Sequence, residues 1–407
     1  MRILWLKTEL LHPVDKGGKI RTYAMLRELR RHHHVTYLTL DDGTAAGDAR
    51  EKAVEYCHEV ETVPFSQPAR GTLGFYADLF RNVFSSLPYA VAKYRSAAFR
   101  QAIERAVATG RFDVVVCDFL TPSVNVPDRL GVPTVLFEHN VEAAIWERHA
   151  SVATHPVKKA YMREQWRRML RWETRECRRF DHVVAVSDAD RDTFRDRMGV
   201  TQVSSVPTGV DIGYFAPTGA TRNSHEIVFT GSMDWLPNED GLEWFCGEIL
   251  PLVRAKVPQA TLSVVGRNPS ARVKSLAARH SGVTVTGTVP DVRPYLERAG
   301  ALVVPLRIGG GTRLKIYEGM SMGRPTVSTT IGAEGLPVHH GEELLIADTA
   351  ADFADAVARL LADPSEGEAL GARAAARVRR DFSWDGVARQ FADTCAAVSA
   401  RVSSGRR

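Results

Sequence analysis

The residues that point most directly to chemistry surround a triple glycine in the last third of the chain. Gly309, Gly310 and Gly311 follow a short apolar run at 301–306, typical of a buried strand, and precede a helical pattern at 312–322. Glycine leaves backbone N–H groups bare at the positive end of such a helix, where phosphate binds readily. This spacing therefore predicts a phosphate site.

Side chains of the same predicted helix extend that site. Thr312 and Arg313 lie in its first turn and would place a hydroxyl and a bidentate cation beside a diphosphate. Glu318, further along the helix, could accept hydrogen bonds from a ribose diol. The alternative is an ordinary glycine turn, in which Lys315 and Glu318 form a surface pair worth about 0.2–0.5 kcal/mol.

Glycine follows other apolar runs as well. Gly231, Gly266 and Gly287 come directly after runs in the second half of the chain, and Gly17 and Gly18 follow the first run of all. In open parallel sheets, ligands bind beyond the carboxyl ends of the strands. The repeated glycines predict a face that is kept clear for a flat or phosphorylated ligand.

Short apolar runs alternate with helical patterns along the whole chain. Strands are predicted at residues 2–6, 35–40, 59–64, 113–117, 134–138, 182–186, 202–206, 226–230, 261–265, 283–286, 301–305, 326–328 and 344–347. Parallel strands need crossover helices between them. The pattern predicts an α/β fold with two doubly wound, Rossmann-like domains facing a central cleft.

A chain of 407 residues is too long for one ordinary core, so two domains are expected. The predicted parts are a first domain at 1–207, a linker at 208–224, a second domain at 225–380, a C-terminal helix at 381–402 that could cross back to the first domain, and a disordered tail at 403–407.

Composition excludes several classes of protein. Hydrophobic content of 44% and charged content of 25% describe a globular chain, and no apolar run reaches the roughly 20 residues of a membrane span. The five cysteines are scattered without metal-ligand spacing, which predicts a reducing cytoplasm and no metal site. A net charge of +5 does not indicate nucleic acid as a partner.

Basic residues are concentrated between positions 158 and 179. Arg163, Arg167, Arg171 and Arg175 recur every four residues and would form one stripe on a helix. Such a stripe can attract anionic lipid head groups at the inner face of a cell membrane. A solvated outer face of a packed helix explains it equally well.

Ordered motifs identify a family. The second half contains FTGSMDWLPNEDGLEWF, VVGRNPS, VTVTGTVPDV and GGGTRLKIYEGMSMGRPTVSTTIGAEGL, and the first half contains the early glycine pair, FEHN and VVAVSDADRDTF. In this order and spacing they resemble the retaining glycosyltransferases of the group 1 (family 4) class. The resemblance implies a GT-B fold whose first domain binds the acceptor and whose second domain binds a nucleotide sugar.

The resemblance also assigns residues on the donor side. Glu318 matches the second glutamate of the family's glutamate pair, which holds the donor ribose, whereas Gly310 stands where the first glutamate would be. Gly231 and Arg267 resemble positions beside the nucleotide, and Val289 lies in the stretch that resembles the base-binding one. The GGGTRLK form resembles a subgroup variant in which Thr312 and Arg313 take the diphosphate end beside the N–H groups of Gly310 and Gly311. The candidates for neutralising the diphosphate are Arg267, Arg313 and Lys315.

On the acceptor side, His139 at the end of FEHN matches the family's histidine near the acceptor and the donor sugar. The alternative is a packed histidine bonded to the backbone. Glu142 is a candidate for orienting the His139 ring. Gly17 and Gly18 match the family loop that approaches the phosphates, and Arg21 one turn later either assists them or lies at the surface.

The resemblance implies a reaction. A sugar would pass from a nucleotide-diphosphate donor to an acceptor hydroxyl with retention, without a metal or another cofactor, with His139, Arg313 and Glu318 in catalytic roles. Preorganised donors would stabilise the leaving diphosphate. A nucleotide-sugar epimerase of the same fold and a non-catalytic scaffold in polysaccharide assembly remain alternatives.

The acceptor is expected to be a glycan or lipid-linked glycan in the synthesis of cell-surface polysaccharide, exopolysaccharide or glycolipid. Residues 71–100 mix aromatic, apolar and basic side chains, and they lie where the family's first domain borders the acceptor. A lipid-linked acceptor, with peripheral membrane contact from the cytoplasm, would suit this segment. A plain hydrophobic core would suit it as well.

Overall fold

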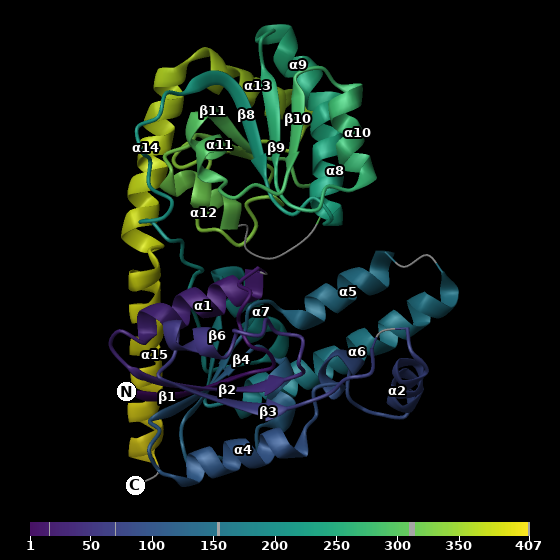
Figure 1. Ribbon diagram of the computed structural model, residues 1–407, viewed down its shortest axis with the longest axis vertical. Helices are drawn as coiled ribbons and strands as arrows, with labels where there is room; N and C mark the ends of the chain where they lie inside the picture. The colour runs from purple at the N-terminus through teal and green to yellow at the C-terminus, as the bar shows by residue number, and fades with distance from the viewer. Residues whose placement is uncertain (16, 70, 153–154, 309–313, 406–407) are drawn as a thin grey trace. The chain divides into compact units, whose positions relative to one another are not determined.

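The structure is a computed structural model, and it describes every residue except 16, 70, 153–154, 309–313 and 406–407. The chain divides into two compact units. Unit 1 comprises Met1–Pro207 and Val387–Arg407, and unit 2 comprises Thr208–Gly386. Each unit is a parallel sheet with helices on both sides (Figure 1).

Unit 1 is built on a seven-stranded sheet in the order β3-β2-β1-β4-β5-β6-β7, with all neighbours parallel. The strands are β1 (Arg2–Lys7), β2 (His34–Asp41), β3 (Glu59–Pro64), β4 (Val114–Asp118), β5 (Thr134–Phe137), β6 (His182–Ala185) and β7 (Val203–Ser205). Strand order reverses beside β1, so the carboxyl ends of β1 and β4 form a switch point where ligands bind in such sheets.

The helices of unit 1 are α1 (Gly17–Leu29), α2 (Leu73–Val83), α3 (Tyr89–Ala92), α4 (Ala97–Ala108), α5 (Glu142–Val152), α6 (Pro156–Arg179), α7 (Asp188–Met198) and α15 (Trp384–Gly405), with short 3₁₀ turns at Glu51–Glu55 and Thr121–Asn125. Alternate residues of β1 face opposite sides of the sheet. Leu4 packs in one core with Phe99 of α4 and Met169 of α6. On the other side, the rings of Trp5 and Phe391 of α15 lie 5.6 Å apart.

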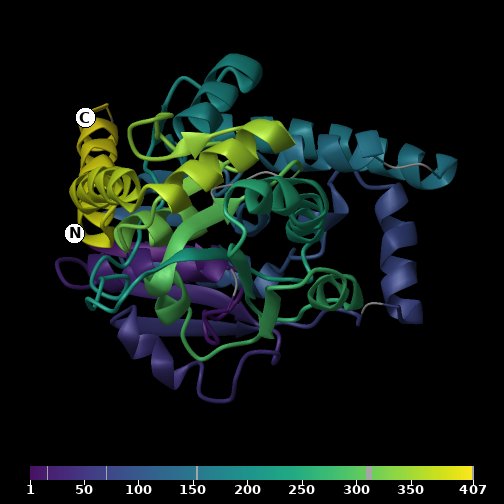
Figure 2. The same cartoon turned by 90° about the horizontal axis from the view of Figure 1, so that it is seen from above.

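Unit 2 has a six-stranded parallel sheet in the order β10-β9-β8-β11-β12-β13. Its strands are β8 (Asn223–Thr230), β9 (Thr261–Val265), β10 (Val283–Gly287), β11 (Ala299–Val304), β12 (Thr326–Ser328) and β13 (Leu345–Ile346). Its helices are α8 (Leu236–Trp244), α9 (Leu250–Lys256), α10 (Ala271–Arg279), α11 (Arg293–Arg298), α12 (Leu314–Ser321), α13 (Ala350–Ala362) and α14 (Pro364–Asp381), with a π-helical turn at Phe245–Ile249. Seen from above in Figure 2, its helices again flank the strands.

Every predicted strand is present, but three predicted boundaries are wrong. β8 begins at Asn223, inside the predicted linker 208–224. The C-terminal helix α15 begins at Trp384 rather than 381 and extends to Gly405, into the predicted tail at 403–407. Contacts with the rest of unit 1 hold its last turns in place, because Ser399 and Arg401 donate hydrogen bonds to the carbonyls of Asp113 and Asp181.

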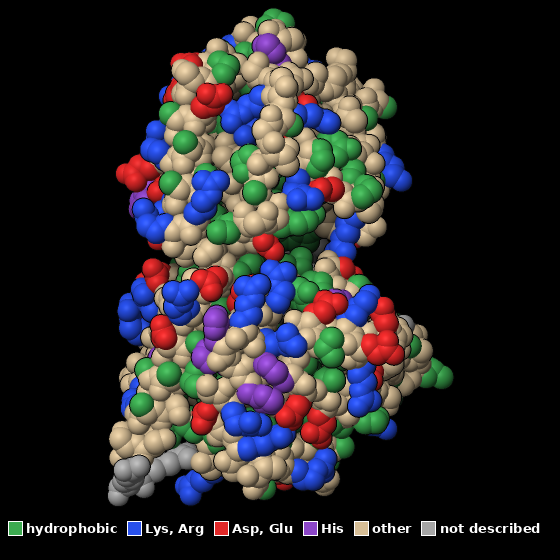
Figure 3. All heavy atoms as spheres, turned by 60° about the vertical axis from the view of Figure 1, so that its left-hand side comes forward, with side chains coloured by type: hydrophobic (Ala, Val, Ile, Leu, Met, Phe, Trp, Pro, Cys, Tyr) green, Lys and Arg blue, Asp and Glu red, His purple; other side chains and the backbone are tan. Residues whose placement is uncertain are grey.

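Charged side chains of both signs are interspersed over the face seen in Figure 3, in keeping with the modest net charge of +5. No helix in the described part of the chain is long and apolar enough to cross a bilayer.

Candidate functional site

A buried charged cluster occupies the carboxyl edge of the unit 1 sheet. Lys7 ends β1, Asp118 ends β4, and His139 follows β5 by two residues. The parallel register pairs Leu6 with Cys117 and Asp118 with Phe137, so the three strand ends are neighbours. Each of the three side chains is almost completely buried, at 4% exposure or less.

Asp118 is the centre of this cluster. Its Oδ2 accepts hydrogen bonds from Lys7 Nζ at 2.8 Å, Thr22 Oγ1 at 2.6 Å and Trp5 Nε1 at 3.0 Å. Its Oδ1 lies 2.7 Å from His139 Nε2, although the angle is outside that of a well-formed hydrogen bond. Burial by itself would raise the pKa of Asp118, but Lys7 and His139 outweigh it and hold that pKa well below its usual value.

The His139 ring is consequently neutral, and one of its two nitrogens has no hydrogen-bond partner in the described part of the chain. Burial lowers its pKa to about 3 although the Asp118 carboxylate opposes the shift. A proton on Nε2 is favoured because two lone pairs would repel at 2.7 Å. Nδ1 then carries a lone pair, and none of the described residues hydrogen-bonds to it. Nδ1 is a buried acceptor, so a hydroxyl group can bond to it only after the side chains that cover the ring have moved.

The predicted glycine loop supports this cluster through Phe119. Phe119 has φ of 78°, a conformation that costs about 1–3 kcal/mol in a residue with a side chain. Its ring lies 4.1 Å from the His139 ring. A Cβ on Gly18 would lie 3.2 Å from Phe119, whereas one on Gly17 would meet nothing. Gly18 therefore leaves room for the ring that covers His139.

Two other acceptor-side predictions have different outcomes. Arg21 is buried rather than at the surface, and it donates a hydrogen bond to the backbone carbonyl of His139. The prediction that Glu142 orients the His139 ring is wrong, because that position is taken by Asp118. Glu142 instead begins α5, where its backbone N–H donates to the buried carboxylate of Glu173 at 2.7 Å.

In unit 2, two of the predicted glycines bring neighbouring strand ends into close contact. The N–H of Gly231, after β8, donates to the carbonyl of Val265 at 3.0 Å. A Cβ on Gly266, after β9, would lie only 1.6 Å from the Gly231 carbonyl oxygen, and one on Gly231 would lie 2.8 Å from Lys315 Nζ. Glycine is therefore required at both positions.

Replacing Gly266 with alanine is expected to destabilise unit 2 by about 2 kcal/mol or more, because the backbone must move to admit the methyl group. Thermal denaturation would show a transition at lower temperature. Gly247 is the matched control, since a Cβ there would contact nothing, and Gly247→Ala should leave the transition in place. Equal transitions for both variants would contradict the close approach at Gly266.

A cation lies directly beside these glycines. Lys315 of α12 donates to Asn238 Oδ1 at 3.2 Å, and its Nζ lies 4.0 Å from the centre of the Phe229 ring. Asn238 is itself buried and donates to the carbonyl of Ser232 at 2.7 Å. Arg267 donates to Ser232 Oγ at 3.2 Å. The predicted residues Gly231, Arg267 and Lys315 thus belong to one cluster.

Glu318 lies one turn after Lys315 on α12. It is partly exposed, and none of the described residues donates a hydrogen bond to its carboxylate. Burial raises its pKa to about 7 despite the opposing charge of Lys315. Val289 is partly buried against the core that contains Ile316 and Tyr317 of α12, so its segment also borders this helix.

Two family models match the chain in succession. The model described as Glycosyltransferase Family 4 matches residues 16–214, and the model described as Glycosyl transferases group 1 matches residues 224–363. The chain belongs to the group 1 glycosyltransferases.

Three relatives of this glycosyltransferase are distant in sequence. An uncharacterized 44.6 kDa protein in the cps region of Klebsiella pneumoniae is 21% identical over 87% of this chain and 89% of that protein. A D-inositol 3-phosphate glycosyltransferase of Actinosynnema mirum is 26% identical over 71% of this chain and 74% of that enzyme. A GDP-mannose-dependent phosphatidylinositol monomannoside mannosyltransferase of Mycobacterium tuberculosis is 27% identical over 52% of this chain and 61% of that enzyme.

Solved structures share the fold across nearly the whole chain. The sucrose-phosphate synthase of Thermosynechococcus elongatus superposes with a TM-score of 0.72 at 18% identity, over 98% of this chain and 99% of that one. The Anabaena protein HepE in complex with UDP gives a TM-score of 0.66 at 15% identity, over 98% and 100%. The glycosyltransferase therefore has the GT-B fold.

Several predicted donor residues of the glycosyltransferase lie outside the described residues. These are Gly310, Gly311, Thr312 and Arg313, together with Gly309 of the same loop. α12 begins at Leu314, directly after them. Their assignment to the diphosphate stays a prediction.

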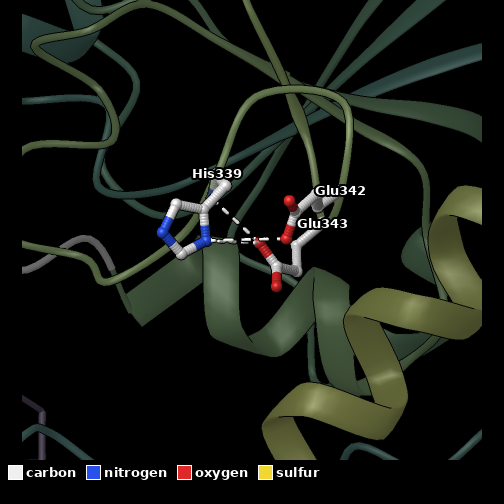
Figure 4. Close-up of side chains that lie close together, drawn as sticks. All are labelled: His339, Glu342 and Glu343. Carbon is white, nitrogen blue, oxygen red and sulfur yellow. Dashed lines mark hydrogen bonds and ion pairs between the residues drawn. The ribbon is translucent and has the colours of Figure 1, made fainter.

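The described residues of the glycosyltransferase include one group with the atoms to hold a metal ion, although none was predicted. His339, Glu342 and Glu343 place their ligand atoms within 4.8 Å of one another (Figure 4). His339 and Glu342 are exposed, and the Glu343 carboxylate already accepts a hydrogen bond from the His339 backbone at 2.8 Å. The group is therefore held together by its own bonds.

Sequence reasoning missed Lys7 and Asp118. Each ends an otherwise apolar strand, RILWLK and VVVCD, at the edge where parallel sheets bind ligands. A charged residue at that position was a usable signal.

Proposed function

We propose that this glycosyltransferase moves a sugar from a nucleotide-diphosphate donor to an acceptor hydroxyl with retention of configuration, without a metal or another cofactor. The observation that carries the proposal is the unbonded Nδ1 of the neutral His139 ring, held by buried charges at the carboxyl edge of its sheet. Among the described residues, Nδ1 of His182 is unbonded as well, so what distinguishes His139 is its place at the carboxyl edge of the sheet beside the buried charges of Lys7 and Asp118.

Unit 2 would hold the donor. Lys315 and Arg267 carry positive charge beside the closely packed backbones of Gly231 and Gly266, where a diphosphate would meet both cations. These groups are fixed before the reaction, so they can stabilise charge that develops on the leaving diphosphate. Arg313, Thr312 and the glycines before them are proposed to add to this, as the sequence predicts.

Unit 1 would bind the acceptor and contact the reacting sugar. His139 accepts a hydrogen bond from a sugar hydroxyl through Nδ1, while Asp118 keeps the proton on Nε2. Because the ring is neutral, Nδ1 has a lone pair for this hydrogen bond, which a protonated ring would lack. Arg21 holds the backbone of His139 and so acts through position.

The names of the relatives support the proposed classes of donor and acceptor. HepE was solved with UDP-glucose, and the mycobacterial enzyme is named as GDP-mannose-dependent with a phosphatidylinositol glycolipid acceptor. The Klebsiella relative is named for its place in the cps region. We propose a glycan or lipid-linked acceptor in cell-surface polysaccharide or glycolipid synthesis, with the reaction in the cytoplasm.

The test is product analysis with the purified protein. UDP- and GDP-sugars are each incubated with and without acceptor, in the presence and absence of EDTA, and the anomeric configuration of the product is determined by NMR. We expect transfer with retention that EDTA does not abolish. Conversion of the donor to its epimer without acceptor would replace the proposal with an epimerase, and absence of donor turnover would favour a scaffold.

Substitution of Glu318 with glutamine tests the ribose contact. With a pKa of about 7, Glu318 must lose its proton to accept both hydrogen bonds of a ribose diol. Wild-type affinity for a nucleotide sugar should therefore rise about tenfold from pH 6 to pH 8, the ratio expected for a group that titrates between them. Calorimetry on Glu318→Gln should show weaker binding without this rise.

The pH comparison uses a nucleotide sugar rather than a free diphosphate, because its phosphodiester oxygens do not titrate in that range. Glu366→Gln on α14 is the control, since Glu366 pairs with Arg359 away from the glycine cluster. The ribose contact is wrong if Glu318→Gln retains wild-type affinity at both pH values.

A further inference from the structure

Helix α2 of unit 1 turns an apolar face to solvent. Its exposed large side chains are spaced three or four residues apart, which places them on one side of a helix. They are Leu73 (90% exposed), Tyr76 (60%), Phe80 (66%), Val83 (54%) and, directly after the helix, Phe84 (79%). The alternative that this segment is plain hydrophobic core is wrong for these five residues.

The opposite side of α2 faces the protein and is mixed in character, with Phe75, Asp78 and Leu79 partly buried and Asn82 buried. Asn82 is 5% exposed, and its Oδ1 accepts a hydrogen bond from the buried amide of Gln165 on α6 at 3.2 Å. Arg168 of α6 donates to the carbonyls of Asn82 at 2.6 Å and Val83 at 3.0 Å. Figures 1 and 2 both show α2 beside α6.

Unlike an ordinary surface helix, α2 leaves five large apolar side chains exposed on one side. An amphipathic helix normally buries its apolar stripe and exposes its polar one. Here the buried amides and the Arg168 guanidinium fix the helix with the apolar stripe outward, since rotating it would strand Asn82 and Gln165 without partners. A contiguous exposed apolar patch of this kind marks an interaction surface.

Positive charge lies beside α2, on the flank that carries Asp78, Arg81 and Asn82. A pocket of about 380 Å³ lies along the flank of α2, and its lining includes Arg81, Lys93 and Arg95. Arg81 pairs with Asp78, which also lines the pocket. Within the described part of the chain, Lys93 and Arg95 form no ion pair, and Lys93 lies over the Tyr94 ring at 4.7 Å. Two cations thus remain to neutralise an external anion.

We propose that α2 docks this glycosyltransferase on an anionic phospholipid surface. Leu73, Phe80 and Phe84 enter the boundary between head groups and acyl chains, and Lys93 and Arg95 pair with lipid phosphate. Tyr76, with an apolar ring and a polar tip, suits the interface itself. The proposal does not depend on the sugar that is transferred, and it places docking on α2 rather than on the arginine stripe of α6.

The test is sedimentation with two kinds of vesicle. One is phosphatidylcholine alone, and the other contains about 30% phosphatidylglycerol, which makes its surface anionic. Wild-type protein should sediment with the anionic vesicles and stay in solution with the neutral ones. Phe80→Ser/Phe84→Ser should weaken binding at least about tenfold, because two large apolar side chains no longer enter the bilayer. Lys93→Gln/Arg95→Gln should weaken binding to anionic vesicles by several-fold.

Matched controls separate this surface from others. Val54→Ser removes an exposed apolar side chain elsewhere in unit 1 and should bind as wild type. All substituted side chains of the α2 variants are exposed or partly exposed, so the unfolding temperature and donor binding in solution should not change.

Four outcomes would overturn the proposal. They are wild-type protein that ignores anionic vesicles, equal binding to neutral and anionic vesicles, full binding by Phe80→Ser/Phe84→Ser, and loss of binding only when Arg163, Arg167 and Arg171 of α6 are changed to glutamine. A wild-type dimer in solution that Phe80→Ser/Phe84→Ser converts to monomer, without vesicle binding, would assign the patch to a second copy of the chain instead.

Discussion

His139→Ala is expected to lower kcat for sugar transfer by about 10²- to 10³-fold, the loss typical of one preorganised polar contact with the reacting group. The imidazole sits at the carboxyl edge of the unit 1 sheet with Nδ1 unbonded among the described residues and Nε2 held by Asp118. Steady-state kinetics with a nucleotide sugar and its acceptor would measure the change.

The effect on kcat must be separated from a loss of folding, because His139 is buried. His182 provides the control, since it begins β6 at the amino edge of the same sheet and pairs with Ser204 Oγ at 2.9 Å. His182→Ala should transfer sugar at nearly the wild-type rate. If His139→Ala folds and turns over as wild type does, the ring has no part in the reaction.

Lys7→Met is expected to lower the free energy of unfolding of unit 1 by about 3–5 kcal/mol, the cost of breaking a buried ion pair from one side. Lys7 and Asp118 lie 2.8 Å apart with side-chain exposures of 4% and 0%. Without the ammonium, the carboxylate keeps its burial but loses its main opposing charge. Chemical denaturation would measure the difference.

A surface lysine gives the comparison. Lys52 pairs with Asp48 at 2.7 Å, but both side chains are about half exposed, so Lys52→Met should change stability little. Adding Asp118→Leu to Lys7→Met should recover part of the loss, because the uncompensated charge is then gone. A Lys7→Met protein as stable as wild type would show that the pair is solvated in solution.

The presence of each strand could be predicted because it depends on local patterns. The runs that form β1 and β4 are apolar throughout except at their ends, and the spacing between runs leaves room only for crossover helices. Boundaries were less certain where tertiary contacts decide them. α15 continues to Gly405 because Ser399 and Arg401 donate hydrogen bonds to the carbonyls of Asp113 and Asp181. The residue types at the end of the helix do not predict these bonds.

The candidate site was predicted in part. Gly231, Gly266 and His139 stood out because each follows an apolar run at the ligand-binding edge, and the family resemblance added Arg267, Lys315 and Glu318. The partner of His139 could not be chosen in this way. Glu142 is three residues from His139 in the chain, whereas Asp118 reaches it through the pairing of β4 with β5.

By itself, the sequence determined the α/β class, the parallel order of strands and helices, the glycines at strand ends and the family. These follow from residue type and spacing along the chain, which act locally. The tertiary structure alone decided that Lys7 meets Asp118 across 111 residues, that His139 is left with one unbonded nitrogen, and that α2 faces solvent with its apolar side. Each of these depends on which side chains share a buried space, because burial sets both the strength of a charge pair and the cost of an unpaired polar group.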